Sequence, residues 1–95
     1  MDLVLSKFGT TFATRERARQ LATSLDVGDD RREVNVNLSG VSTASPSFLA
    51  ELLTHLANRF VGISVEGGSD HVQRVTFSLV EKLGLTGRVR EVASR

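Results

Sequence analysis

The chain has 95 residues, of which 40% are hydrophobic and 24% are charged. These values are typical of one small globular domain that covers residues 1–95 and buries only a modest share of its surface. Cys, Trp and Tyr are absent, and the formal net charge is +1. The composition therefore excludes a disulfide framework and a thiolate metal site, and it argues against nucleic-acid binding.

Targeting and membrane signals are absent from the sequence as printed. No apolar run approaches the ~20 residues that cross a bilayer. Residues 1–6 lack a basic region ahead of a long apolar core, so they do not resemble a signal peptide. We therefore expect a cytoplasmic protein with no membrane partner.

The first half of the chain predicts a strand, a helix and a second strand. Apolar residues within 2–8 favour a short strand, and Thr14 suits the N-cap of a helix that reaches Leu25. Helical spacing predicts the buried face of that helix: Ala18, Leu21, Ala22 and Leu25. A polar turn over 26–32 leads into a strand over 33–38. Its apolar and polar residues alternate, which predicts two different sheet faces. Val34, Val36 and Leu38 are expected to face the helices, and Asn35 and Asn37 are expected on a partly wet face.

The most informative segment is a hydroxyl-rich loop that runs into a helix. Ser45 suits the N-cap and Pro46 the first helical position, so we expect a helix over 46–59. Its apolar stripe is Phe48, Leu49, Leu52, Leu53, Leu56 and Phe60. Unpaired N–H groups and the positive end of the helix dipole meet at its start, which suits an anion or a phosphoryl group. The hydroxyls expected there belong to Ser42, Thr43, Ser45 and Ser47.

The second half predicts a strand, a helix and an edge strand. A strand over 61–65 precedes a helix that begins after Ser69 and stops at Gly84, and the tail over 88–92 adds an edge strand. Phe77 falls beside the apolar stripe, so it either packs under the tail or lies at a subunit contact. The alternation predicts an α/β domain with a mixed or parallel central sheet, right-handed crossovers and helices mainly on one face.

Glu51 and His55 share a helix face because they are one turn apart. They are candidates for contacts with a partner; the alternative is solvated positions, with Glu51 paired to Arg15 or Arg19. Glu-x-x-x-His lacks a third ligand nearby, so we expect no metal site. One carboxylate without a paired acid gives little reason for acid–base catalysis, so we expect no enzyme and no cofactor.

Other candidate features have simpler structural explanations. Capping alone explains Ser45, at typically about 1 kcal/mol, whereas for Ser42 and Ser47 phosphorylation and a purely structural role stay open. A tight turn at residues 67–68 is favoured over a phosphate-binding loop, because Asp70 would repel an anion. The basic cluster is expected to be a solvated face; it comprises Arg15, Arg17, Arg19, Arg31 and Arg32.

The run Leu-Ser-Gly-Val at 38–41, a polar loop, and Ser-Phe-Leu-Ala-Glu-Leu at 47–52 resemble the STAS fold. STAS is the domain of anti-sigma-factor antagonists and of sulfate-transporter tails. The Ser-Phe-x-x-Glu-Leu pattern looks closest to the STAS-like family of unknown function. Phe-Gly at 8–9 and Thr-Arg-x-x-Ala at 14–18 also resemble that family. The resemblance covers most of residues 7–65.

In the antagonists, the loop that matches 42–47 carries an Asp-Ser-Ser-Gly-like motif. A GHKL-type kinase phosphorylates its first serine, and the phosphate releases the partner. Pro46 stands at that serine's position and cannot accept a phosphate, which leaves Ser45 or Ser47 as substitutes. The resemblance implies a non-enzymatic regulatory module that docks a protein partner, such as a GHKL-type ATPase or kinase. The contacts expected beyond the three serines are Thr43, Phe48, Glu51 and His55.

Two other functions stay open. One is a nucleotide or small-anion sensor that uses the same helix N-terminus. The other is a structural subunit whose small core is completed by self-association through Phe77 or an edge strand.

Overall fold

The computed structural model describes residues 2–24 and 33–91, and strands and helices alternate along these ranges. The predicted turn over 26–32, with Arg31 and Arg32, and the predicted helical residue Leu25 lie outside the described residues. The strands are β1 (Asp2–Val4), β2 (Thr11–Phe12), β3 (Glu33–Asn37), β4 (Thr43–Ala44), β5 (Gly62–Glu66) and β6 (Val89–Glu91). The helices are the 3-10 turn η1 (Leu5–Lys7), α1 (Arg15–Ser24), α2 (Pro46–Arg59) and α3 (Asp70–Lys82).

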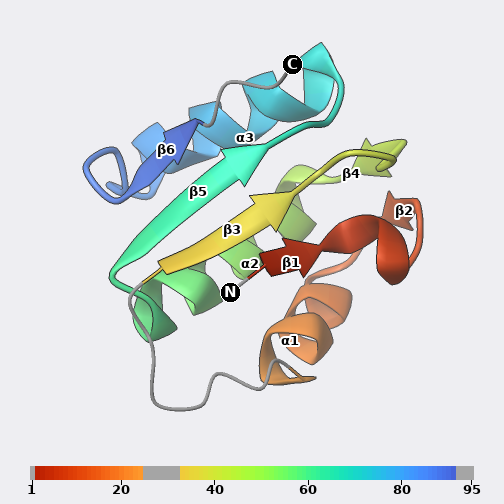
Figure 1. Cartoon of the computed structure of the whole chain (residues 1–95), viewed down its shortest axis with the longest axis horizontal. Coiled ribbons are helices and arrows are strands. Elements are labelled where there is room, and N and C mark those ends of the chain that lie inside the picture. Colours follow the sequence, from red (N-terminus) through yellow and green to blue (C-terminus); the bar gives the residue numbers. More distant parts are fainter. Residues whose placement is uncertain (1, 25–32, 92–95) are drawn as a thin grey trace.

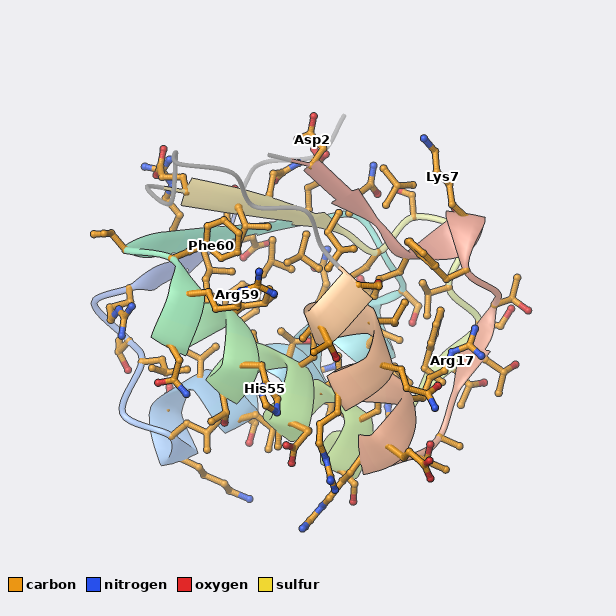
Figure 2. The ribbon with its side chains drawn as sticks, turned by 90° about the horizontal axis from the view of Figure 1, so that it is seen from below. Asp2, Lys7, Arg17, His55, Arg59 and Phe60 are labelled. Carbon is orange, nitrogen blue, oxygen red and sulfur yellow. The ribbon has the colours of Figure 1, made fainter. Side chains whose placement is uncertain are left out.

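The main sheet has the order β1-β3-β5-β6, and every neighbouring pair is parallel. Each crossover steps to the next strand in the same direction. Crossovers of one hand therefore place their helices on the same face. Figure 2 shows this arrangement, with the sheet along the top of the view and α1, α2 and α3 beneath it. The predicted α/β class is confirmed, and the sheet is parallel with its helices on one face.

A second, two-stranded sheet lies beyond the end of β3 (Figure 1). It pairs β2 with β4 in parallel, Thr11 opposite Thr43 and Phe12 opposite Ala44. Because α1 follows β2 and α2 follows β4 within a few residues, this pairing sets the two helix starts side by side. The small sheet is therefore the element that positions the hydroxyl-rich loop.

The core lies between the main sheet and the helices. The rings of Phe12 and Phe48 meet there with their centroids 4.8 Å apart and tilted by 33°. The predicted apolar stripe of α2 is buried, and so is the described part of the predicted face of α1. Both helices are thus held by burial of these stripes, at roughly 25 cal/mol for each Å² of apolar surface removed from water.

The opposite face of the sheet is polar and carries its own hydrogen bonds. The Nδ2 of Asn35 donates to the carboxylate of Glu66 at 2.8 Å, and the Oγ of Ser64 donates to the Oδ1 of Asn35 at 2.9 Å. Asn35 and Asn37 are half-buried. The expected alternation in β3 is confirmed, since its valines face the helices and its asparagines face away.

The predicted helix starts hold, and the strand boundaries shift by small amounts. Thr14, Ser45 and Ser69 accept first-turn N–H groups through their hydroxyls, as expected of N-caps. The strand expected over 2–8 ends at Val4, because the N–H of Phe8 donates to the carbonyl of Leu5 and closes the 3-10 turn. Along the described ranges, no helix has the length and apolar character needed to span a membrane.

The turn after β5 is a tight turn, as expected. Gly67 and Gly68 have φ angles of 73° and 86°, a region that favours glycine. A Cβ on Gly67 would lie 2.2 Å from the Oγ of Ser39, so this turn packs directly against the loop after β3.

Candidate functional site

The loop over residues 42–47 is fixed by backbone hydrogen bonds to the segment that precedes α1. The N–H groups of Ser42 and Thr43 both donate to the carbonyl of Thr10, at 2.8 and 3.2 Å. The N–H of Ser45 donates to the carbonyl of Phe12 at 2.8 Å. The loop is thus a supported part of the fold, and its side chains are presented from a backbone with defined positions.

The hydroxyl of Ser45 is used twice within the fold. It accepts the N–H of Phe48 at 3.1 Å, which caps α2, and it donates to the carbonyl of Ala13 at 3.0 Å. The prediction that Ser45 is a capping residue is confirmed. The second bond adds a link between the starts of α1 and α2 that sequence spacing does not reveal.

Capping leaves few donors for an anion at the start of α2. Pro46 has no N–H, the N–H of Phe48 is held by Ser45, and that of Ser45 is held by Phe12. Within the described ranges, only the N–H of Ser47 is without a partner among the first-turn donors. One free backbone N–H group is too few donors to bind a phosphate well.

Three of the four expected hydroxyls face solvent. Ser42, Thr43 and Ser47 are exposed, and no described residue forms a hydrogen bond with their hydroxyls. We call these three residues the hydroxyl surface. It lies at the start of α2 and next to β2, and the structure brings its members together from β4, the residue before it and the first turn of α2.

Glu51 is the centre of a polar contact between α1 and α2. Its Oε2 accepts from the Nε2 of His55 at 2.8 Å and lies 3.6 Å from the Nε of Arg19. The expected structural pairing of Glu51 therefore forms with Arg19. The side chains of Glu51 and His55 are 25% and 38% exposed, so both still reach the surface.

The two helices run side by side in a fixed register. The contacts Ala13–Ser45 and Arg19–Glu51 both join residues 32 positions apart in the chain. The same register places Arg15, one turn before Arg19, level with Ser47, one turn before Glu51.

The expected partner contact at Phe48 is wrong. Phe48 is 0% exposed and packs against Phe12 in the core. The physical reason is its place in the apolar stripe of α2, which faces the sheet. Thr43, Glu51 and His55, by contrast, lie where a partner can reach them.

A groove between α1 and α2 adjoins this site. It has a volume of about 330 Å³ and is lined by Arg19, Ala22, Thr23, His55 and Arg59. Figure 2 shows His55 and Arg59 projecting from α2, and the guanidinium of Arg59 donates to the carbonyl of Ala22. Sequence spacing predicts that His55 belongs to this site. It does not predict the role of Arg59, because the partner of Arg59 comes from α1.

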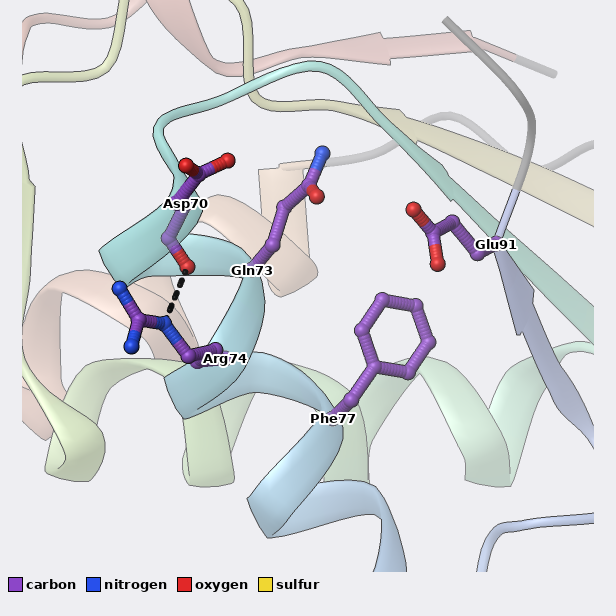
Figure 3. A pocket seen from close by; sticks show the side chains of 5 residues that line it. All are labelled: Asp70, Gln73, Arg74, Phe77 and Glu91. Carbon is purple, nitrogen blue, oxygen red and sulfur yellow. Dashed lines mark hydrogen bonds between the residues drawn. The ribbon is translucent and has the colours of Figure 1, made fainter.

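Phe77 lies on the other side of the molecule, in α3. It is half-buried against the core and borders a cavity of about 360 Å³ whose opposite wall is Glu91 of β6 (Figure 3). The remaining lining residues are Asp70, Gln73 and Arg74. Of the two expected positions for Phe77, this one favours packing beside the described part of the tail over a subunit contact.

The described ranges contain no cluster of three or more His, Asp or Glu side chains that could hold a metal ion. The chain matches no family model, no curated protein and no solved structure. The STAS-like resemblance therefore stays a prediction that rests on the motifs of the sequence.

Proposed function

We propose that this domain is a non-enzymatic, cytoplasmic regulatory module that binds a protein partner. The docking site is the hydroxyl surface with the neighbouring polar side chains of α2, Glu51 and His55. The STAS-like motifs favour this function, and a GHKL-type ATPase or kinase is the partner class that they favour.

The observation that supports this proposal most directly is that the serines at the start of α2 have different roles. Ser45 holds the fold together, whereas Ser42, Thr43 and Ser47 are exposed on a backbone fixed by Thr10 and Phe12. Hydroxyls on a pre-ordered backbone lose little entropy when they bind a partner. Such a surface suits a hydrogen-bonded protein contact.

Ser47 is the hydroxyl that suits phosphorylation best. It is exposed in the first turn of α2, where the helix dipole favours negative charge. Arg15 lies level with it and is exposed, so a phosphate at Ser47 can pair with a guanidinium. A phosphate there would change the charge of the docking surface, and this is the switch that we propose in place of the absent serine at position 46.

A nucleotide or small-anion sensor is the alternative function. It has less support, because capping by Ser45 and the ring of Pro46 remove most donors from the start of α2. A nucleotide that binds the folded state would raise the melting temperature. We expect no such rise across a panel of nucleotides and inorganic phosphate; a clear rise that S47A removes would favour the sensor.

The docking proposal is tested with a triple alanine variant at Ser42, Thr43 and Ser47. We expect it to fold as the wild type does and to lose the partners that the wild-type domain captures in quantitative affinity purification. The matched control replaces an exposed threonine away from the site, T86A, and should retain them. Unchanged capture by the triple variant would contradict the proposal.

A further inference from the structure

A second groove begins at the docking site and runs along α3. It has a volume of about 270 Å³ and is lined by Pro46 of α2 and by five residues of α3: Arg74, Val75, Ser78, Leu79 and Lys82. Pro46 directly precedes Ser47, so the groove ends next to a residue of the hydroxyl surface.

The floor of this groove is apolar. Val75 and Leu79 are one helical turn apart, and both are partly buried against the core. Pro46 is exposed and adds its ring from the start of α2. A floor of this kind suits the apolar side chains of a partner.

The rim of the groove is cationic. Arg74 and Lys82 are exposed, and no carboxylate of the described residues lies within ion-pair distance of either one. The Nε of Arg74 donates to the backbone carbonyl of Asp70, which leaves its charge uncompensated by that contact. The positive end of the α2 dipole at Pro46 has the same sign.

The acidic side chains nearby face other parts of the surface. Glu51 points toward α1, where it contacts Arg19 and His55. Asp70 does not line this groove; it lines the cavity beside Phe77, whose wall also includes Arg74 (Figure 3), and Glu81 lines neither. The groove therefore combines an apolar floor with a rim of one charge sign.

We propose that this groove binds an acidic amphipathic helix of the partner protein. Arg74 and Lys82 are eight residues apart, about 12 Å along α3, which is roughly two turns of a helix lying beside it. Acidic residues at that spacing pair with the two cations while apolar residues between them enter the groove. This inference rests on the proposed docking function and adds the chemistry of the partner.

The test uses a labelled synthetic peptide of about 12 residues, long enough for three helical turns, with leucines on one face and glutamates flanking them. A matched peptide has glutamines in place of the glutamates, and another has lysines. Binding to the full chain is followed by backbone amide shifts in a ¹⁵N–¹H spectrum and by fluorescence anisotropy. We expect the glutamate peptide to shift the amides of Val75, Ser78 and Leu79, and to bind roughly 3- to 10-fold more tightly than the glutamine peptide at low salt.

The charge-reversed variant R74E/K82E should bind the lysine peptide in preference to the glutamate peptide. The control variant K7E/R90E has the same net charge but keeps the groove, and it should bind as the wild type does. Equal binding of the three peptides, or shifts confined to residues outside the groove, would overturn the proposal. If the groove binds apolar side chains without a charge preference, the three peptides will bind equally and will still shift the amides of the groove residues.

The two proposals fail separately. If R74E/K82E keeps its cellular partners while the triple alanine variant of the hydroxyl surface loses them, the docking function stands and the acidic helix is wrong. If the triple alanine variant keeps its partners while the glutamate peptide still binds the groove with the expected charge preference, the hydroxyl surface is wrong.

Discussion

Ser39 packs against the backbone of Gly67, so closely that a Cβ on Gly67 would lie 2.2 Å from the Oγ and 2.8 Å from the backbone nitrogen of Ser39. This contact joins the loop after β3 to the turn after β5. It keeps the carboxyl ends of the two central strands together, because the neighbouring N–H of Leu38 also donates to the carbonyl of Glu66.

We expect G67A to lower the free energy of unfolding by about 2 kcal/mol or more, since backbone strain and the clash with Ser39 act together. The matched control is G84A. Gly84 has a similar φ of 72°, but a Cβ there meets nothing within 4 Å. G84A should therefore cost only about 1 kcal/mol. Urea unfolding measures the free energy of unfolding of both variants. Equal losses in G67A and G84A would show that the contact with Ser39 contributes little.

Ser45 supports a second prediction, because its hydroxyl both caps α2 and bonds to Ala13. We expect S45A to lower the free energy of unfolding by about 1–2 kcal/mol, the cost of a lost cap with a further lost hydrogen bond. S47A removes a hydroxyl two residues away that has no described partner, and it should change stability by less than about 0.5 kcal/mol. Similar losses in the two variants would contradict the roles assigned to these serines.

Phe48 allows a direct check of the corrected assignment. Its side chain is fully buried against Phe12, so F48A should cost about 3–5 kcal/mol and leave a chain this small largely unfolded. F48L retains most of the apolar volume and should fold with a smaller loss. We expect F48L to bind partners as the wild type does in affinity purification. Loss of binding by a folded F48L, with its circular dichroism spectrum unchanged, would return Phe48 to the docking site.

The sequence predicts α2 well because its start and its face are both encoded locally. Ser45 and Pro46 mark the first turn, and the apolar residues repeat at helical spacing to Phe60, so both ends follow from short-range rules. The same spacing shows that Phe48 belongs to the buried stripe. The motif predicts a surface contact at Phe48, but the helical spacing places it on the buried face, and the structure agrees with the spacing.

The features that the sequence does not predict depend on contacts between distant segments. The β2–β4 pair consists of two-residue strands, which are too short to show a periodicity. The choice between Arg15 and Arg19 as the partner of Glu51 depends on the register of α1 against α2, which the link from Ser45 to Ala13 sets. The groove on α3 likewise exists only because Pro46 comes to lie beside Val75 and Leu79.

That register also leads to a prediction about charge at Ser47. S47E places a carboxylate in the first turn of α2 and level with Arg15, where the helix dipole and the guanidinium both favour it. We expect S47E to raise the free energy of unfolding by about 0.5 kcal/mol at low salt, and the gain should shrink as salt screens the charges. Thermal or urea unfolding at two ionic strengths measures the effect.

Two matched variants separate the causes of that gain. T54E adds the same charge to an exposed position in the middle of α2, far from the helix start, and should leave stability nearly unchanged. When Arg15 is replaced by Gln (R15Q), S47E should raise the free energy of unfolding by less, because the ion pair is lost. The part of the increase that comes from the helix dipole should remain. If S47E destabilises the domain, or if R15Q leaves its gain intact at every salt concentration, then Arg15 does not lie level with Ser47 and the proposed phosphate pairing is lost with it.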